Sequence, residues 1–145
     1  MPHREGDDVR NVVLNQMNQP FADYALDQAA MDKWAKIIAV RTAVNGALEA
    51  ARNEKKIGKS LEANVAVTVP AEDAFLAEMD EQELADLFIV SQISVTVGGE
   101  LAVAVEPAKG EKCERCWKFH IKVGANADHP TLCPRCASVV AKSAI

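Results

Sequence analysis

The sequence predicts an α+β fold in which one long helix, a small mixed or antiparallel sheet and short helices precede a cysteine-rich C-terminal module. Three observations lead to this prediction. Apolar residues recur at helical spacing over residues 27–56. Three shorter segments, at 63–69, 89–97 and 101–105, are rich in β-branched residues. Four cysteines form two Cys-x-x-Cys pairs near the C-terminus.

Composition is that of an ordinary globular protein. The 145 residues suit one domain plus a small module, and 49% hydrophobic with 26% charged residues argue against disorder. No uninterrupted apolar run is long enough to span a membrane, and the N-terminal residues lack the apolar core of a secretory signal. We therefore expect a cytoplasmic protein with no membrane partner, and we expect a monomer.

The helix predicted over 27–56 has clear end signals. Asp27 is a suitable N-cap, and Gly58 marks the end. Lys55 and Lys56 fall in the predicted last turn, where positive charge favours the helix dipole. One face carries the apolar residues that we expect in the core, which are Met31, Trp34, Ile37, Ile38, Val44, Leu48 and Ala51.

The sheet is predicted from three strands that follow this helix. Residues 63–69 alternate in polarity and form the first strand, and residues 71–88 suit one or two short helices. Residues 89–97 form the second strand and 101–105 the third. Because Gly98-Gly99 lies between two β-branched runs, we expect the last two strands to pair as a hairpin.

Composition divides the chain into three parts. Residues 1–26 form a lead-in with an apolar patch at 12–14 that suits a short strand, residues 27–106 form the body, and residues 107–145 form the module. The net charge of −5 is uneven, because residues 106–145 carry seven basic and four acidic residues, a balance of +3 that leaves −8 elsewhere. Positive charge beside the cysteines indicates contact with a phosphate backbone.

The cysteine spacing predicts a structural zinc site. Two tight turns, sixteen residues apart, each aim two sulfurs at one ion, and four thiolates leave no open position for a catalytic water. We expect a short hairpin between the pairs, as in zinc ribbons, and folding energy supplied largely by the metal. The predicted ligands are Cys113, Cys116, Cys133 and Cys136.

Other uses of these residues are weaker. One Cys-x-x-Cys pair would suffice for redox chemistry, and no thioredoxin-like strand precedes either pair. His120 and His129 are interpreted as surface histidines or as groups around the ligands, because four thiolates already complete the coordination.

Two clusters are candidates for nucleic-acid contact. Trp117 follows the first cysteine pair and is either a base-stacking platform or the small core of the module. We call the two Cys-x-x-Cys turns, 113–116 and 133–136, the first and second knuckle. The basic residues in and beside them suit phosphate or base contact; they are Arg115, Lys118 and Arg135. A second basic cluster lies at the end of the long helix and is either a phosphate contact or a solvated helix end; it contains Arg52, Lys55, Lys56 and Lys59.

Two blocks of the sequence resemble one known family. Lys112-Cys-Glu-Arg-Cys-Trp117 with Leu132-Cys-Pro-Arg-Cys136 resembles the C-terminal zinc module of bacterial isoleucyl-tRNA synthetases. The segment from Trp34 to Ala63 is similar to the end of their anticodon-binding helical domain. The resemblance extends from about residue 12 to 140, and the two blocks occur in the family's order.

The resemblance implies a role in tRNA recognition. These enzymes use ATP and Mg²⁺ to attach isoleucine to its tRNA, but their two nucleotide-binding signature motifs are absent from this sequence. We therefore expect a C-terminal part of an isoleucine–tRNA ligase that has no catalysis of its own. It would support recognition of the anticodon end of tRNA-Ile within the full synthetase. The four cysteines become the expected zinc ligands, and Trp117, Arg115 and Arg135 become candidate tRNA contacts.

Two alternatives remain open. A similar zinc module ends a group of DNA-repair glycosylases, which would make this a DNA-binding module, although the long Trp34 block has no counterpart there. In the second alternative, the chain is a free-standing structural or interaction protein in which zinc only stabilises the fold. Basic residues beside Trp117 favour RNA binding, whereas the −8 charge of the rest of the chain favours a structural protein stabilised by zinc.

Overall fold

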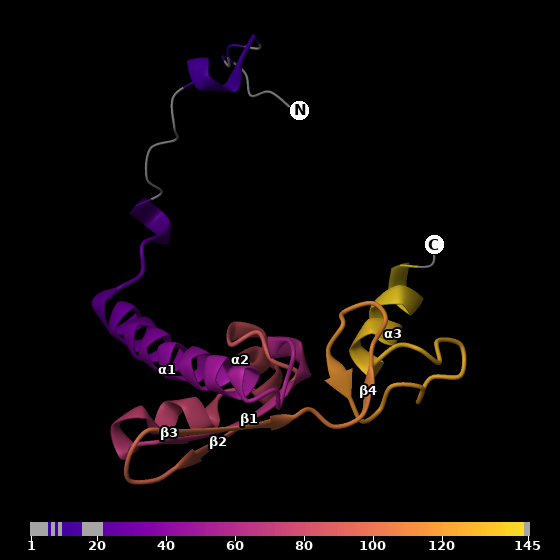
Figure 1. Cartoon of the computed structure of the whole chain (residues 1–145). Coiled ribbons are helices and arrows are strands. Elements are labelled where there is room, and N and C mark those ends of the chain that lie inside the picture. The colour runs from indigo at the N-terminus through magenta and orange to yellow at the C-terminus, as the bar shows by residue number, and fades with distance from the viewer. Residues whose placement is uncertain (1–5, 7, 9, 16–21, 144–145) are drawn as a thin grey trace.

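The computed structural model describes residues 6, 8, 10–15 and 22–143, and it has the predicted α+β fold (Figure 1). Short 3-10 helices η1 (Val12–Leu14) and η2 (Ala22–Tyr24) come first. The apolar patch at 12–14 is thus a 3-10 turn, and the strand expected there was wrong; much of the expected lead-in at 1–26 lies outside the described residues. Of the helices described, none is long and apolar enough to cross a bilayer.

Helix α1 (Gln28–Asn53) is the long helix. The Asp27 carboxylate accepts a hydrogen bond from the Ala30 N–H at 2.8 Å and caps its start, as predicted. The helix ends earlier than predicted, because Lys55 takes a left-handed φ of 59° and turns the chain away. Lys55 and Lys56 therefore lie beyond the last turn, whose basic residue is Arg52.

We expect Asp27→Ala to lower the free energy of unfolding by about 1 kcal/mol, because the Ala30 N–H loses its side-chain acceptor. Chemical denaturation followed by circular dichroism measures this. Asp32→Ala, on an exposed turn of the same helix, is the matched control and should change stability less. Equal losses from the two variants would contradict the capping role.

The buried stripe of α1 starts later than the sequence pattern indicated. Its buried residues are Ile37, Val40, Val44, Leu48 and Ala51. Trp34 is 41% exposed, and Met31 and Ile38 are also exposed, so placing these three in the core was wrong. The first turns of α1 meet η4 through polar contacts instead: the ammonium of Lys36 lies 2.9 Å from an Asp73 carboxylate oxygen.

The sheet has the order β2-β1-β3. Strand β1 (Ala63–Val69) pairs in parallel with β2 (Gln92–Val97) and antiparallel with β3 (Ala102–Pro107). The predicted hairpin between the last two strands was therefore wrong. With β3 on its second side, β1 bonds along both edges, and Val103 and Val105 pack against the core beneath α1.

The segment between β1 and β2 holds the two predicted short helices, η4 (Ala71–Glu78) and α2 (Glu81–Leu87). Strand β2 begins at Gln92 rather than at Ile89, because Ile89 has a φ of 58° and lies exposed in the turn after α2. Phe88 and Leu84 close the core from this side, while α1 packs on β3 and β1. Alternate residues of β1 point into that core, from Ala63 to Val69.

The module contains the short strands β4 (Glu111–Lys112) and β5 (Phe119–His120) and the helix α3 (Pro134–Ser143). The two strands pair antiparallel around the first cysteine pair. We expected a hairpin between the two cysteine pairs, and that prediction was wrong. Residues 121–132 form turns without strand pairing, and the hairpin of β4 and β5 surrounds the first pair instead. In Figure 1 the module extends from the end of the sheet, in orange and yellow.

Candidate metal centre and nucleic-acid surface

The four cysteine sulfurs meet at one point between the two knuckles. They all lie within 4.8 Å of one another, and the Sγ atoms of Cys116 and Cys133 are 3.9 Å apart. A tetrahedral ion with bonds of about 2.3 Å to sulfur separates its ligands by about 3.8 Å. None of the four cysteines is in a disulfide. Four gathered thiols at this spacing fit Zn²⁺ and leave no open position for substrate.

The first knuckle is held by backbone bonds. The Cys113 N–H donates to the Lys118 carbonyl at 2.9 Å, and the Trp117 N–H donates to the Cys113 carbonyl at 2.9 Å. This loop requires a φ of 66° at Trp117, which is costly for a bulky residue. Gly110 allows β4 to approach β5 closely, because a Cβ there would lie 2.4 Å from the His120 carbonyl carbon.

The second knuckle is the start of a helix. Cys133 precedes α3, and Cys136 lies in its first turn, so both sulfurs face the first knuckle. Sequence reasoning missed α3. Two signals were available: Pro134 occupies the first helical position, and Lys142 lies in the last turn.

The sulfurs differ in how readily they ionise. Burial opposes ionisation of Cys113, but backbone N–H groups that point at its sulfur, such as that of Cys133 at 3.3 Å, lower the pKa of this thiol to about 6. Burial raises the pKa of Cys116 to about 12 and also raises the pKa of Cys133. A metal must therefore displace protons, so its affinity falls as the pH falls. The Arg115 guanidinium donates a hydrogen bond to the Cys136 sulfur at 3.8 Å.

The two histidines lie outside this sulfur cluster. The group of possible ligand atoms contains only cysteines in the described part of the chain. His120 accepts a hydrogen bond from the Lys122 N–H at its Nδ1, 2.9 Å away. Its ring therefore caps a turn of the module.

Trp117 is exposed at the joint between body and module. Trp117 is 56% exposed, and the Lys112 ammonium lies 4.9 Å from the centroid of its ring. A small hollow beside it combines residues of both parts; its lining is Lys59, Leu61, Glu62, Lys112, Trp117 and Phe119. An aromatic face and two lysines from different parts of the chain therefore share one surface.

Comparison with known proteins agrees with this site. Residues 110–139 match the family model described as "Zinc finger found in FPG and IleRS". The chain is 42% identical to the isoleucine–tRNA ligase of Geobacillus kaustophilus, over 97% of this chain and 16% of that protein. Identity to the ligase of Gloeobacter violaceus is 47%, over 77% of this chain and 12% of that protein.

The chain matches the C-terminal region of isoleucine–tRNA ligases. It spans 12–16% of the length of the curated relatives that it matches. The match to the zinc-finger model contains all four cysteines of the sulfur cluster. Together, the family model and the cluster support a structural zinc.

The candidate tRNA contacts suggested by the resemblance to isoleucine–tRNA ligases fall into two groups. Arg135 is exposed at the start of α3, as is Trp117 on the first knuckle. Lys118 instead lies against the body, where its ammonium is 2.5 Å from an Asp86 carboxylate oxygen and its side chain is only 14% exposed. This ammonium holds the pKa of the Asp86 carboxyl below its usual range.

The basic residues at the end of α1 and just beyond it do not gather at one point. The Arg52 guanidinium contacts Glu49 and the Ser60 hydroxyl, the latter at 3.3 Å. Lys56 pairs with Glu54 at 2.7 Å. Of the cluster, only Lys59 lines the hollow beside Trp117.

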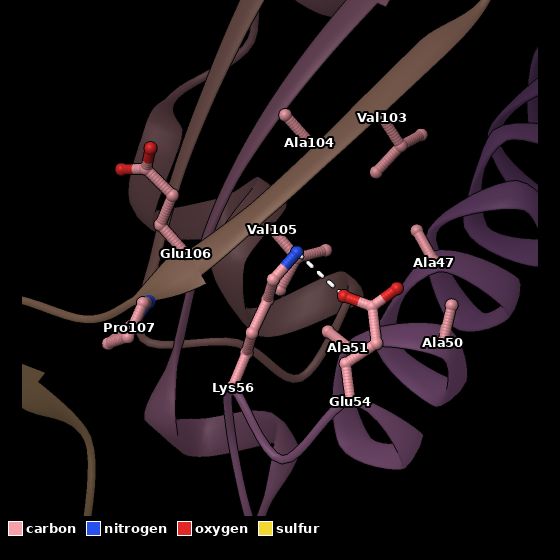
Figure 2. Close-up of a pocket in the computed structure, with 10 residues that line it drawn as sticks. All are labelled: Ala47, Ala50, Ala51, Glu54, Lys56, Val103, Ala104, Val105, Glu106 and Pro107. Atoms are coloured by element: carbon pink, nitrogen blue, oxygen red, sulfur yellow. Dashed lines mark ion pairs between the residues drawn. The ribbon is translucent and has the colours of Figure 1, made fainter.

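Figure 2 shows a groove of about 750 Å³ between α1 and the edge strand β3. Three alanines of the helix and two valines of the strand form half of its lining, and the Lys56–Glu54 ion pair lies along it. Its ten lining residues include no histidine, cysteine or serine. Its charged lining residues are Glu54, Lys56 and Glu106, and the first two are paired with each other.

Proposed function

We propose that this chain serves an isoleucine–tRNA ligase as a tRNA-binding C-terminal part, with a structural zinc bound by Cys113, Cys116, Cys133 and Cys136. The observation that supports the proposal best is the surface around Trp117. An exposed aromatic ring, held at a φ of 66° beside Lys112 and Lys59, suits stacking of an unpaired base with its phosphates on the lysines.

The zinc has an architectural role in this proposal. It fixes the first knuckle, and the knuckle fixes the backbone of Trp117 through the bond to the Cys113 carbonyl. The ATP- and Mg²⁺-dependent ligation itself belongs to the full synthetase, because this sequence lacks the two nucleotide-binding motifs. Contact with the anticodon end of tRNA-Ile is the part of that reaction that this chain would support.

Arg135 and Arg115 have different parts in the proposal. Arg135 is exposed on the first turn of α3 and is free of any acidic partner within hydrogen-bond distance among the described residues, which suits a phosphate contact. Arg115 is also exposed, but its guanidinium is directed to the Cys136 sulfur. We therefore assign Arg115 to the cysteine cluster before tRNA contact.

The test is binding of labelled tRNA-Ile and of a second tRNA of equal size, with zinc content measured on the same sample. Preference for tRNA-Ile with one zinc per chain is the expected result. Equal affinity for duplex DNA and tRNA would favour the DNA-binding alternative. One zinc per chain without binding of either RNA would contradict RNA binding by this chain. It would favour a structural role in which zinc only stabilises the fold.

Trp117→Ala is expected to weaken tRNA binding by about 5- to 150-fold, because stacking of one base on an aromatic ring contributes about 1–3 kcal/mol. Zinc content should stay at one per chain. Trp117→Phe, which keeps an aromatic face, is the matched control and should retain most of the affinity. Loss of zinc from Trp117→Ala would mean that the ring is instead the small core of the module.

A further inference from the structure

Body and module meet through polar groups. The two apolar clusters of the described chain share no residue: one lies between α1 and the sheet, and the other surrounds the four cysteines. Hollows flank the joint on both sides, one of about 40 Å³ next to Trp117 and one of about 300 Å³ next to His120. Neither buried apolar cluster therefore extends across the joint, and the apolar residues that line the smaller hollow from the two sides, Leu61 and Phe119, are only partly buried.

Ser91 lies at the centre of this joint. Among the residues that the structure describes, Ser91 is the one polar residue that is buried, with 9% of its surface exposed. Its hydroxyl donates to the Leu61 carbonyl of the body at 2.5 Å and accepts from the Phe119 N–H of the module at 2.7 Å. One side chain thus ties the backbone before β1 to the backbone of β5.

Two further contacts lie on either side of this bridge. The Gln92 side-chain amide bonds both backbone groups of Lys109, its oxygen accepting from the N–H at 3.0 Å and its nitrogen donating to the carbonyl at 2.8 Å. The Asp86–Lys118 ion pair lies nearby, with the Asp86 side chain about half exposed. The Lys118 side chain of this pair is 14% exposed, so the pair is only partly screened by solvent, but Ser91 is the more deeply buried of these groups and bonds both parts at once.

We propose that Ser91 is a positioning residue that fixes the module on the body and thereby places the Trp117 ring. Phe119 is two residues after Trp117, so the bond to the Phe119 N–H holds the strand that carries the ring. Without the hydroxyl, the Phe119 N–H and the Leu61 carbonyl lose their shared partner, and the module can turn about Gly110, just beyond the backbone bonds that hold Ala108 and Lys109 to the body. The role in RNA binding rests on the proposed function, whereas the role in orientation does not.

The experiment compares wild type with Ser91→Ala, using the zinc-loaded chain. Residual dipolar couplings report the orientation of backbone N–H bonds in both parts. We expect one alignment tensor to fit body and module in the wild type, and reduced module couplings in Ser91→Ala with zinc retained. Ser94→Ala, at an exposed position of β2 three residues after Ser91, is the matched control and should behave as the wild type.

Binding of tRNA-Ile then tests the positioning role. Loss of one buried hydrogen bond predicts about tenfold weaker binding by Ser91→Ala and unchanged binding by Ser94→Ala. Wild-type couplings in Ser91→Ala would overturn the proposal, and so would altered couplings with unchanged affinity. If the wild type itself binds no tRNA, the proposed function fails, while the couplings still decide whether Ser91 fixes the module.

A measurement on the wild type covers the case in which Ser91→Ala does not fold. The bond to Ser91 predicts slow hydrogen exchange at the Phe119 N–H. Exchange at that amide as fast as in an unstructured peptide would overturn the proposal. Protection comparable to that of the central strand β1 would support it.

Discussion

Removal of zinc is expected to unfold the module (107–145) and to leave the body (27–106) folded. The module is too small to hold a core by burial alone, and its apolar cluster consists of the four cysteines with Val123 and Leu132 packed against them. Without the ion, four thiols face one another with no shared partner. The body has its own core between α1 and the sheet, so it does not need the metal.

Heteronuclear NMR on the zinc-loaded chain before and after chelation measures this. Amide signals from 111–143 should collapse to unstructured positions, and signals from β1 and α1 should persist. Zinc added back should restore the first set, whereas Mg²⁺ should not, because it prefers oxygen ligands. Loss of the body signals on chelation would contradict the proposed division into two units.

Phe88→Ala is expected to lower the free energy of unfolding of the body by about 3–5 kcal/mol. Phe88 is only 1% exposed and is the largest of the fully buried side chains. It lies at the end of α2, where it fills the core beneath the sheet, and an alanine there leaves a cavity. Because the module has a separate cluster, zinc should still bind at one per chain.

Urea denaturation followed by far-UV circular dichroism gives the free energy. Ile38→Ala is the matched control, because Ile38 is also a large apolar residue but is 58% exposed on α1. Its effect should stay within about 0.5 kcal/mol, as for most surface substitutions. A similar small effect for Phe88→Ala would mean that the core does not pack around this ring.

The candidate metal site was largely predictable because its signal is local. Two residues between paired cysteines define a turn, and the separation of the pairs allows both turns to reach one ion. Even so, spacing did not reveal that Cys136 lies in the first turn of a helix, or that Arg115 is directed to its sulfur. The first depends on helix formation after Pro134, and the second on a contact across twenty-one residues.

The exposure of side chains was less predictable than their pattern. Trp34, Ile38 and Val44 occur at helical spacing, but only Val44 has the sheet beneath it. Lys118 is basic and close to Trp117, yet its charge is engaged by an aspartate 32 residues earlier. A periodic pattern shows which residues share a face of a helix, and it does not show what covers that face.

The sequence by itself determined the long helix, the three strands of the sheet and the paired cysteines of the candidate zinc site. The cap at Asp27, the alternation from Ala63 to Val69 and the paired cysteines are each set by neighbours within a few residues. Only the tertiary structure decided that β3 crosses to the far edge of β1, and that Ser91 joins the body to Phe119. The physical reason is that strand alternation specifies a buried face but no pairing partner, and a serine's hydrogen bonds depend on which backbone groups folding brings to it.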